Sequence, residues 1–309
     1  MSKILTGMNK NGDFRVHLAL TTDMCQEARS VHKTTPVATA ALGRTLTAAA
    51  MMSKDLKNET ARLSIIIKGN GPAGQIIVTA DGAGNVKGNI ANPFVDLPLK
   101  NGKLDVGGAL GIGDLTVVKD IGLKEPYSGT IALASGEIAE DLTAYYYISE
   151  QRNTSVALGV KVGKNLDVVC AAGLFVQMLP GASEKSVEAL EKLLSDMLPI
   201  TSVCEIATEK FPLLSEEGLL EAMRDEIFKE VPKEFFPETL EFKDARWKCD
   251  CSKERMQNAL MTIGRKEIEN IIEEDGKAEL VCHFCNTKYD FSKQELEDVC
   301  DLIKRGANS

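Results

Sequence analysis

Short apolar segments that alternate with polar turn residues dominate the first 180 positions of the chain. Runs rich in β-branched residues and bounded by Gly, Asn and Asp are typical of antiparallel strands and hairpins. Such runs occupy residues 62–69, 74–81, 85–91, 114–121, 128–135, 154–162 and 166–179. A helix is predicted from Pro36, with Thr35 as its N-cap, and a second one within residues 136–151.

The pattern changes to amphipathic helices after Pro180. Ser183 is the predicted N-cap of a helix whose apolar residues recur at spacings of three and four: Val187, Leu190, Leu194 and Met197. A similar stripe follows in Leu219, Met223 and Ile227, with Phe228 beside it. Residues 183–245 therefore form a predicted acidic helical linker, which has too little core of its own and must dock against its neighbours.

The last 64 residues contain another set of short elements. Two helices that each end at a glycine are predicted over 253–264 and 265–276, followed by a hairpin over 278–292 and a final helix. The predicted fold class is therefore α+β. It has a large N-terminal mixed α/β domain with antiparallel sheets (1–182), the helical linker (183–245) and a small C-terminal domain (246–309).

Composition and charge narrow the possible functions. No run reaches the ~18 apolar residues of a membrane span, and the first 20 residues lack the pattern of a signal peptide, so we expect a cytoplasmic protein without a membrane partner. The net charge of −9 argues against binding of nucleic acid by phosphate neutralisation.

Four of the eight cysteines form a pattern with metal-ligand spacing. Cys249 and Cys251 flank one aspartate, and 30 residues separate Cys251 from the CxxC motif of Cys282 and Cys285. In a cytosolic chain such a cluster indicates metal binding or redox activity rather than a disulfide framework. Four sulfurs satisfy a tetrahedral Zn²⁺ ion, and four thiolates also suit a rubredoxin-like iron site.

The same cysteines fit either a permanent structural zinc site or a redox switch. A disulfide between Cys249 and Cys251 would close a very small ring, so it would be strained and easily reduced. Structural zinc contributes on the order of 10–16 kcal/mol, which rivals the whole stability of a small domain. Oxidation of the ligands should then unfold residues 246–309, remove a docking surface from the linker and expose its apolar stripes.

Other candidate sites are weaker. The segment GNGPAG (69–74) matches the dinucleotide fingerprint, but a strand follows where a helix is required, so a β-turn is the better interpretation. Cys25 and His32 lie too far apart on one helix to act as nucleophile and base. His17 is expected in a strand and His283 in a solvated turn. No catalytic constellation is present, so an enzyme is not supported. Buried structural positions are expected for Cys170, Cys204 and Cys300.

The chain resembles the redox-regulated 33-kilodalton heat-shock chaperone family of bacteria. The resemblance covers nearly the whole length and rests on the four-cysteine pattern and on the stretches at 122–151 and 173–182. It implies an ATP-independent holdase that binds unfolding proteins during oxidative stress. In such proteins the reduced form holds one Zn²⁺ per chain and is inactive.

The resemblance also implies how the switch works. Oxidants together with unfolding conditions form the disulfides Cys249–Cys251 and Cys282–Cys285, release zinc and unfold the linker. Clients then bind, and the active form is typically a homodimer. Two alternatives remain: a constitutive zinc-ribbon protein that binds nucleic acid or a protein partner, and a thiol–disulfide oxidoreductase that uses Cys282 and Cys285.

Overall fold

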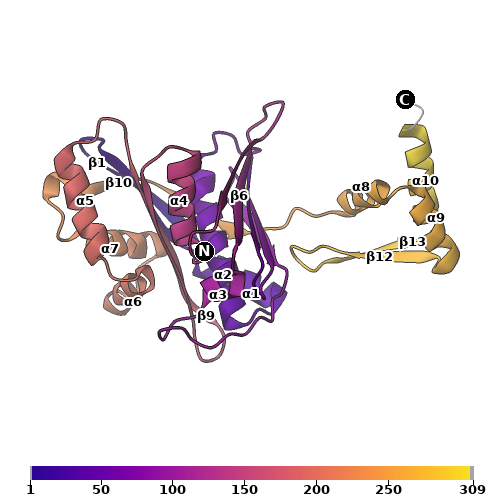
Figure 1. Ribbon diagram of the computed structural model, residues 1–309, viewed down its shortest axis with the longest axis horizontal. Coiled ribbons are helices and arrows are strands. Elements are labelled where there is room, and N and C mark those ends of the chain that lie inside the picture. The colour runs from indigo at the N-terminus through magenta and orange to yellow at the C-terminus, as the bar shows by residue number, and fades with distance from the viewer. Residues whose placement is uncertain (1, 307–309) are drawn as a thin grey trace. The chain divides into compact units, whose positions relative to one another are not determined.

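The computed structural model describes residues 2–306, and the chain divides into two compact units, Met1–Lys248 and Cys249–Ser309 (Figure 1). The first unit therefore contains both the predicted N-terminal domain and the predicted linker. The boundary between those two parts stays a prediction. The predicted α+β class with antiparallel sheets is confirmed.

An antiparallel sheet of five strands, in the order β10-β1-β2-β9-β8, lies at the centre of the first unit. Its strands are β1 (Lys3–Asn9), β2 (Phe14–Leu20), β8 (Thr154–Val162), β9 (Val168–Met178) and β10 (Pro237–Asp244). The sequence pattern predicted β8 and β9 and placed His17 in a strand, which is confirmed by β2. Both faces of this sheet are covered, so most residues of β1, β2 and β9 are buried and show no polar alternation.

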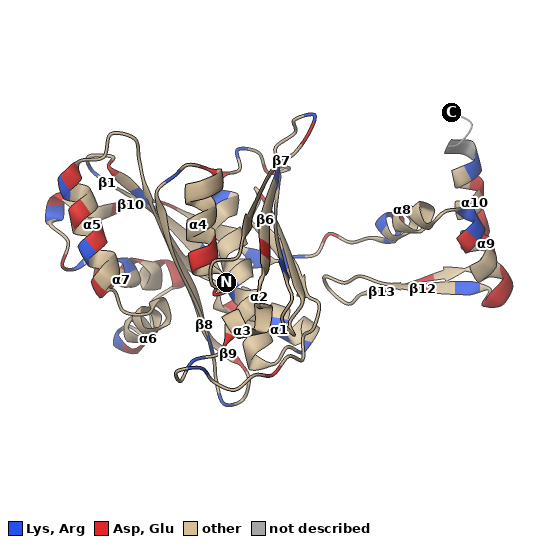
Figure 2. Ribbon diagram, viewed as in Figure 1, with Lys and Arg blue, Asp and Glu red and all other residues tan. Residues whose placement is uncertain are grey.

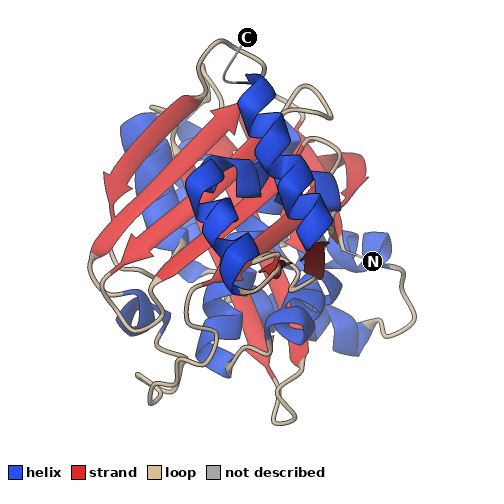
Figure 3. Ribbon diagram, turned by 90° about the vertical axis from the view of Figure 1, so that its right-hand side faces the viewer, coloured by secondary structure: helices blue, strands red, loops and turns tan. Residues whose placement is uncertain are grey.

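A second sheet of six strands has the order β11-β5-β4-β3-β6-β7, and its strands lie side by side in Figure 3. They are β3 (Arg62–Gly69), β4 (Gln75–Asp81), β5 (Asn85–Ile90), β6 (Gly113–Asp120), β7 (Tyr127–Ala132) and β11 (Arg246–Trp247). Buried residues alternate along β3, β4 and β5, as expected where one sheet face meets the core. The GNGPAG segment is the turn that joins β3 to β4, which confirms the β-turn interpretation.

Helices of the first half of the chain pack between the two sheets (Figure 1). They are α1 (Thr22–His32), α2 (Pro36–Met52), η1 (Ser53–Asp55), α3 (Val106–Leu110) and α4 (Ala139–Ser149). α2 contacts both sheets and is buried on all sides, which its small residues allow. A Cβ at Gly43 would lie 2.9 Å from the Val160 side chain, so this position needs glycine for close packing.

The predicted start of α2 and its predicted N-cap residue are both correct. Thr35 occupies the N-cap position and Pro36 the first turn. The Thr35 hydroxyl does not accept a hydrogen bond from the helix and instead donates to the carbonyl of Val95. The Thr35 side chain therefore makes a tertiary hydrogen bond instead of a capping hydrogen bond.

The linker helices cover the other face of the five-stranded sheet (Figure 1). They are α5 (Glu184–Asp196), α6 (Ile200–Lys210) and α7 (Glu216–Phe228), followed by η2 (Lys233–Phe235). The Ser183 hydroxyl accepts a hydrogen bond from Ser186 N, which confirms the predicted cap. The segment is not helical throughout, because its last residues form β10, which pairs with β1. Its polar sequence hid this strand, since β10 is an exposed edge.

The second unit has the predicted elements. They are α8 (Lys253–Ile263), α9 (Arg265–Glu274), β12 (Lys277–Val281), β13 (Lys288–Ser292) and α10 (Lys293–Gly306). Its buried hydrophobic cluster is small, and in the described part of the unit it consists of Leu260, Ile268, Phe291, Leu296, Val299 and Cys300. A core of this size needs additional stabilisation, such as a structural metal.

Candidate metal and redox centre

The structure brings Cys249, Cys251, Cys282 and Cys285 together. Their sulfur atoms all lie within 4.8 Å of one another. The sulfurs of Cys249 and Cys282 are 3.7 Å apart, and those of Cys251 and Cys285 are 3.3 Å apart. Zn–S bonds of ~2.3 Å in a tetrahedron place the sulfurs about 3.8 Å apart, so this arrangement fits such an ion.

Local backbone geometry positions each cysteine pair. A turn joins β12 to β13, and in it the Cys282 carbonyl accepts hydrogen bonds from the N–H groups of Cys285 (3.3 Å) and Asn286 (2.8 Å). Asn286 adopts φ +58°, a conformation that asparagine tolerates well. On the other side, the Ser252 hydroxyl caps α8 immediately after Cys251. The cluster is therefore set by a turn and a helix start.

Two further side chains contact the sulfurs, and the sequence pattern predicted neither of them. The Tyr289 hydroxyl donates a hydrogen bond to the Cys251 sulfur (3.1 Å), and the Thr287 hydroxyl lies 3.2 Å from the Cys285 sulfur. These residues follow Cys285 at positions +2 and +4. Alternate residues of an extended segment share one face, so this period could have identified them.

Three thiols of the cluster differ in acidity. Burial acts to raise the pKa of Cys285, but hydrogen bonds with Thr287, Cys251 and Cys249 together outweigh it and lower this pKa to about 7. Burial raises the pKa of the Cys249 and Cys282 thiols. Cys285 therefore loses its proton more readily than Cys249 or Cys282.

The polar residues between the cysteines lie outside the sulfur cluster. His283 is exposed and does not join the four sulfurs, in line with the expected solvated turn. Asp250 forms an ion pair with Arg255 in the first turn of α8. Its carboxylate thus also fixes the segment that carries Cys249 and Cys251.

The other sequence candidates do not form a catalytic site. Cys25 and His32 are both buried on α1, and each has its own partners. The Cys25 sulfur lies 3.6 Å from the Gly43 carbonyl, and His32 Nε2 lies 2.9 Å from the Gly88 carbonyl. They serve the packing of α1 rather than nucleophilic chemistry.

Together, two sheets packed on a shared helical layer and a separate four-cysteine unit define a layered α+β protein with a cysteine cluster that could hold a metal ion. The chain belongs to the Hsp33 family, because the family model described as "Hsp33 protein" matches residues 2–292. Members of this family are chaperones and not enzymes, which agrees with the sequence-based expectation.

Curated relatives and a solved structure agree with this assignment. The chain is 44% identical to the 33 kDa chaperonin of Acetivibrio thermocellus over 302 residues. This match covers 97% of this chain and 97% of the relative. It is 41% identical to the 33 kDa chaperonin of Bacillus velezensis, over 99% of this chain and 100% of the relative. The crystal structure of the Thermotoga maritima 33 kDa chaperonin matches with a TM-score of 0.83 and 35% identity, over 98% of this chain and 99% of that one.

Proposed function

We propose that this protein is an ATP-independent holdase that oxidation of the four-cysteine centre switches on. The observation that carries the proposal is the convergence of four sulfurs, within 4.8 Å of one another, in a unit with a very small core. Oxidation of such a centre removes the ligands and the main source of stability of that unit at the same time. Membership of the Hsp33 family supports a chaperone rather than a constitutive zinc-ribbon protein.

Cys249, Cys251, Cys282 and Cys285 would hold one Zn²⁺ per chain in the reduced form. When bound, zinc keeps the four sulfurs as thiolates, which react with oxidants without first losing a proton. On oxidation we expect the disulfides Cys249–Cys251 and Cys282–Cys285. Each pair of thiolates gives up two electrons to one hydrogen peroxide, which takes up two protons from the solvent and becomes two water molecules.

The linker docks on the five-stranded sheet through its own hydrophobic cluster. The buried linker residues of that cluster are Leu190, Ile200, Val203, Cys204, Ala207, Leu220, Met223, Ile227, Phe228, Val231 and Phe235. This contact lies wholly within the first unit. Oxidation of the second unit alone leaves this contact in place, so we expect release of the linker to need unfolding conditions as well.

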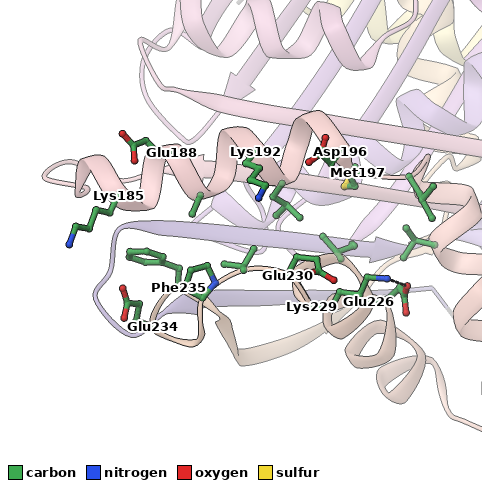
Figure 4. A pocket seen from close by; sticks show the side chains of 17 residues that line it. Lys185, Glu188, Lys192, Asp196, Met197, Glu226, Lys229, Glu230, Glu234 and Phe235 are labelled. Carbon is green, nitrogen blue, oxygen red and sulfur yellow. Dashed lines mark hydrogen bonds and ion pairs between the residues drawn. The ribbon is translucent and has the colours of Figure 1, made fainter.

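Helix α5 is the least firmly packed part of the linker. Of its predicted apolar stripe only Leu190 is fully buried. The helix also carries charges of both signs (Figure 2). A pocket of about 790 Å³ separates it from α7 and η2, and in Figure 4 Lys192 and Met197 face Phe235 and Glu230 across it. A second pocket of about 790 Å³ runs along its other flank, near Tyr147. Side chains that line these two pockets lack dispersion contacts on one side, so α5 is the easiest linker helix to detach from the sheet.

The chain itself links the two units closely. Trp247 of β11 pairs with Val86 of β5, and the Lys248 N–H donates to the Val86 carbonyl (2.9 Å). Cys249 is the next residue. Movement of Cys249 on oxidation therefore acts directly on β11, and through Ala245 on the end of β10.

We further propose that the clients are unfolding proteins, which bind to the exposed apolar surface of the linker. A homodimer is expected in the oxidised form. No helix within the described residues is long and apolar enough to cross a bilayer. Together with the family assignment and the net charge of −9, this favours a cytoplasmic protein with neither a membrane nor a nucleic-acid partner.

The test follows zinc and client aggregation in one experiment. The zinc-loaded protein is treated with hydrogen peroxide at 25 °C and at an unfolding temperature, while a chromogenic chelator reports zinc and light scattering reports a thermally unfolding client. We expect suppression of aggregation only after zinc is released. Zinc release without suppression at either temperature would refute the holdase.

Matched variants make this test specific. Cys282→Ser should abolish the oxidative gain in suppression, whereas Cys300→Ser, which changes a cysteine outside the cluster in the same unit, should retain it. Nucleic-acid binding that persists after oxidation and weakens steeply with salt would favour the zinc-ribbon alternative. Insulin reduction by the zinc-free protein would favour the oxidoreductase.

A further inference from the structure

A second pair of cysteines lies in the first unit, far along the chain from the metal centre. Cys170 is in β9 of the five-stranded sheet, and Cys204 is in α6 of the linker. Both side chains are buried in the cluster that holds the linker on the sheet. α6 packs directly on β9, so the two thiols lie on facing elements, where each shifts the pKa of the other.

Neighbouring contacts fix α6 close to the sheet at this point. Lys161 is the cross-strand partner of Cys170, and its ammonium group forms an ion pair with Glu205, the residue after Cys204. One turn away, a Cβ at Gly159 would lie 2.6 Å from Thr201 Cγ2. The absence of a side chain at Gly159 lets the start of α6 approach the strands. These contacts hold α6 against β8 and β9 on both sides of the two cysteines.

The remaining buried cysteine of this unit does not compete for either sulfur. Cys25 belongs to the hydrophobic cluster on the opposite face of the sheet, where its sulfur lies 3.6 Å from the Gly43 carbonyl. Cys170 and Cys204 thus have only each other on their side of the sheet, within the described residues.

We propose that Cys170 and Cys204 form a second redox site, in which hydrogen peroxide produces a disulfide that fastens α6 to β9. The Cys204 thiolate attacks one peroxide oxygen and becomes a sulfenic acid, with loss of the other oxygen as hydroxide. The Cys170 sulfur then displaces the hydroxyl group, so the S–S bond forms and the S–O bond breaks. In sum, two thiols and one peroxide give one disulfide and two water molecules.

The order of attack follows from the unequal acidity of the two thiols. The hydrogen bond between them lowers the pKa of Cys204 and raises that of Cys170, and the Thr208 hydroxyl also lowers the pKa of Cys204. Both side chains are buried, but Cys204 is 5% exposed and Cys170 is 2% exposed. It is therefore the thiol that a small oxidant meets first.

This disulfide opposes the release of the linker. It closes a loop over residues 170–204, which contains α5, and ties α6 to β9, an interior strand of the five-stranded sheet. The metal centre loosens the linker on oxidation, while this pair limits how far the linker opens. The effect on the linker rests on the proposed function, whereas formation of the disulfide does not.

The direct test maps disulfides in the full-length, zinc-loaded protein. After peroxide treatment, free thiols are alkylated without reduction and the chain is cut with trypsin, which places Cys170 in residues 165–185 and Cys204 in residues 193–210. We expect these two peptides to be linked and to separate on reduction, while Cys25 is alkylated. Free or over-oxidised Cys170 and Cys204 would overturn the proposal.

Limited proteolysis then measures the effect on the linker. The rate of cleavage in residues 183–245 is compared before and after peroxide in the wild type, in Cys204→Ala and in the control Cys25→Ala, which also loses a buried sulfur. Peroxide should accelerate cleavage several-fold more in Cys204→Ala than in the other two. Equal acceleration in all three would overturn the restraining role. If this protein is not a holdase, the aggregation assay will show no suppression. The linked peptide still decides whether Cys170 and Cys204 form a second redox site.

Discussion

The hydroxyl of Tyr289 donates a hydrogen bond to the sulfur of Cys251 at 3.1 Å. Tyr289 lies in β13, after the CxxC turn, whereas Cys251 precedes α8, so this bond joins the two halves of the sulfur cluster. A donor to a ligand sulfur fixes its orientation and lowers its electron density. Tyr289 should therefore protect Cys251 from oxidants and hold it in place for a metal.

Replacement of Tyr289 by phenylalanine removes this bond and keeps the ring. We expect zinc affinity to fall by about 10-fold or more, as for other residues that orient metal ligands, and zinc release by peroxide to become faster. Competition with a chelator measures the affinity. Tyr147→Phe, an exposed position on α4, is the control. An affinity within twofold of wild type would show that the bond has no such role.

Removal of the metal should unfold the second unit and leave the first one folded. The six buried residues of its described core cannot offset the chain entropy of this unit, whereas the first unit has two large clusters. After chelation we expect amides of α8, α9 and α10 to exchange within seconds, while those of β3 and β4 stay protected. Mass spectrometry of deuterium uptake measures both. Unchanged protection of α10 would contradict a structural role of the metal.

Local sequence patterns determined much of the fold because they depend on neighbouring residues. The hairpins β3–β4 and β12–β13, the Ser183 cap and the glycine-terminated helices of the second unit follow from turn residues and periodicity. The spacing of Cys249, Cys251, Cys282 and Cys285 likewise predicted a cluster that the structure shows. Whether these residues bind zinc and form the expected disulfides stays a prediction.

Elements that depend on distant partners were not predictable. β10 has an edge-strand sequence, and only its pairing with β1, more than 200 residues away, makes it a strand. For the same reason the sequence predicted that the linker docks against its neighbours but could not identify the five-stranded sheet as its docking surface. Contacts such as those of Cys170 with Cys204 arise from this packing and have no local signal.

Weaker docking of the linker should lower the threshold for activation. Leu220 of α7 is fully buried against the sheet, so Leu220→Ala should cost about 2–5 kcal/mol of docking free energy. The variant should suppress client aggregation at a lower peroxide dose or temperature than the wild type. Leu213→Ala is the matched control, because Leu213 is 97% exposed. Identical thresholds for all three proteins would exclude linker release as the step that limits activation.

Protonation of His17 should destabilise the first unit in mild acid. Its ring is buried in β2, where Nδ1 lies 3.1 Å from the Thr6 hydroxyl, and burial, aided by the charge of Arg15, lowers its pKa from 6.5 to about 4. Below pH 6.5 the unfolded chain binds a proton that the folded chain does not, so the free energy of unfolding falls until the pH reaches about 4. Between pH 7.5 and 5 this effect amounts to about 2 kcal/mol. Urea unfolding at both pH values should show this loss of stability in the wild type and in the exposed control His283→Asn, but not in His17→Asn. An equal loss in His17→Asn would assign the pH dependence to other groups.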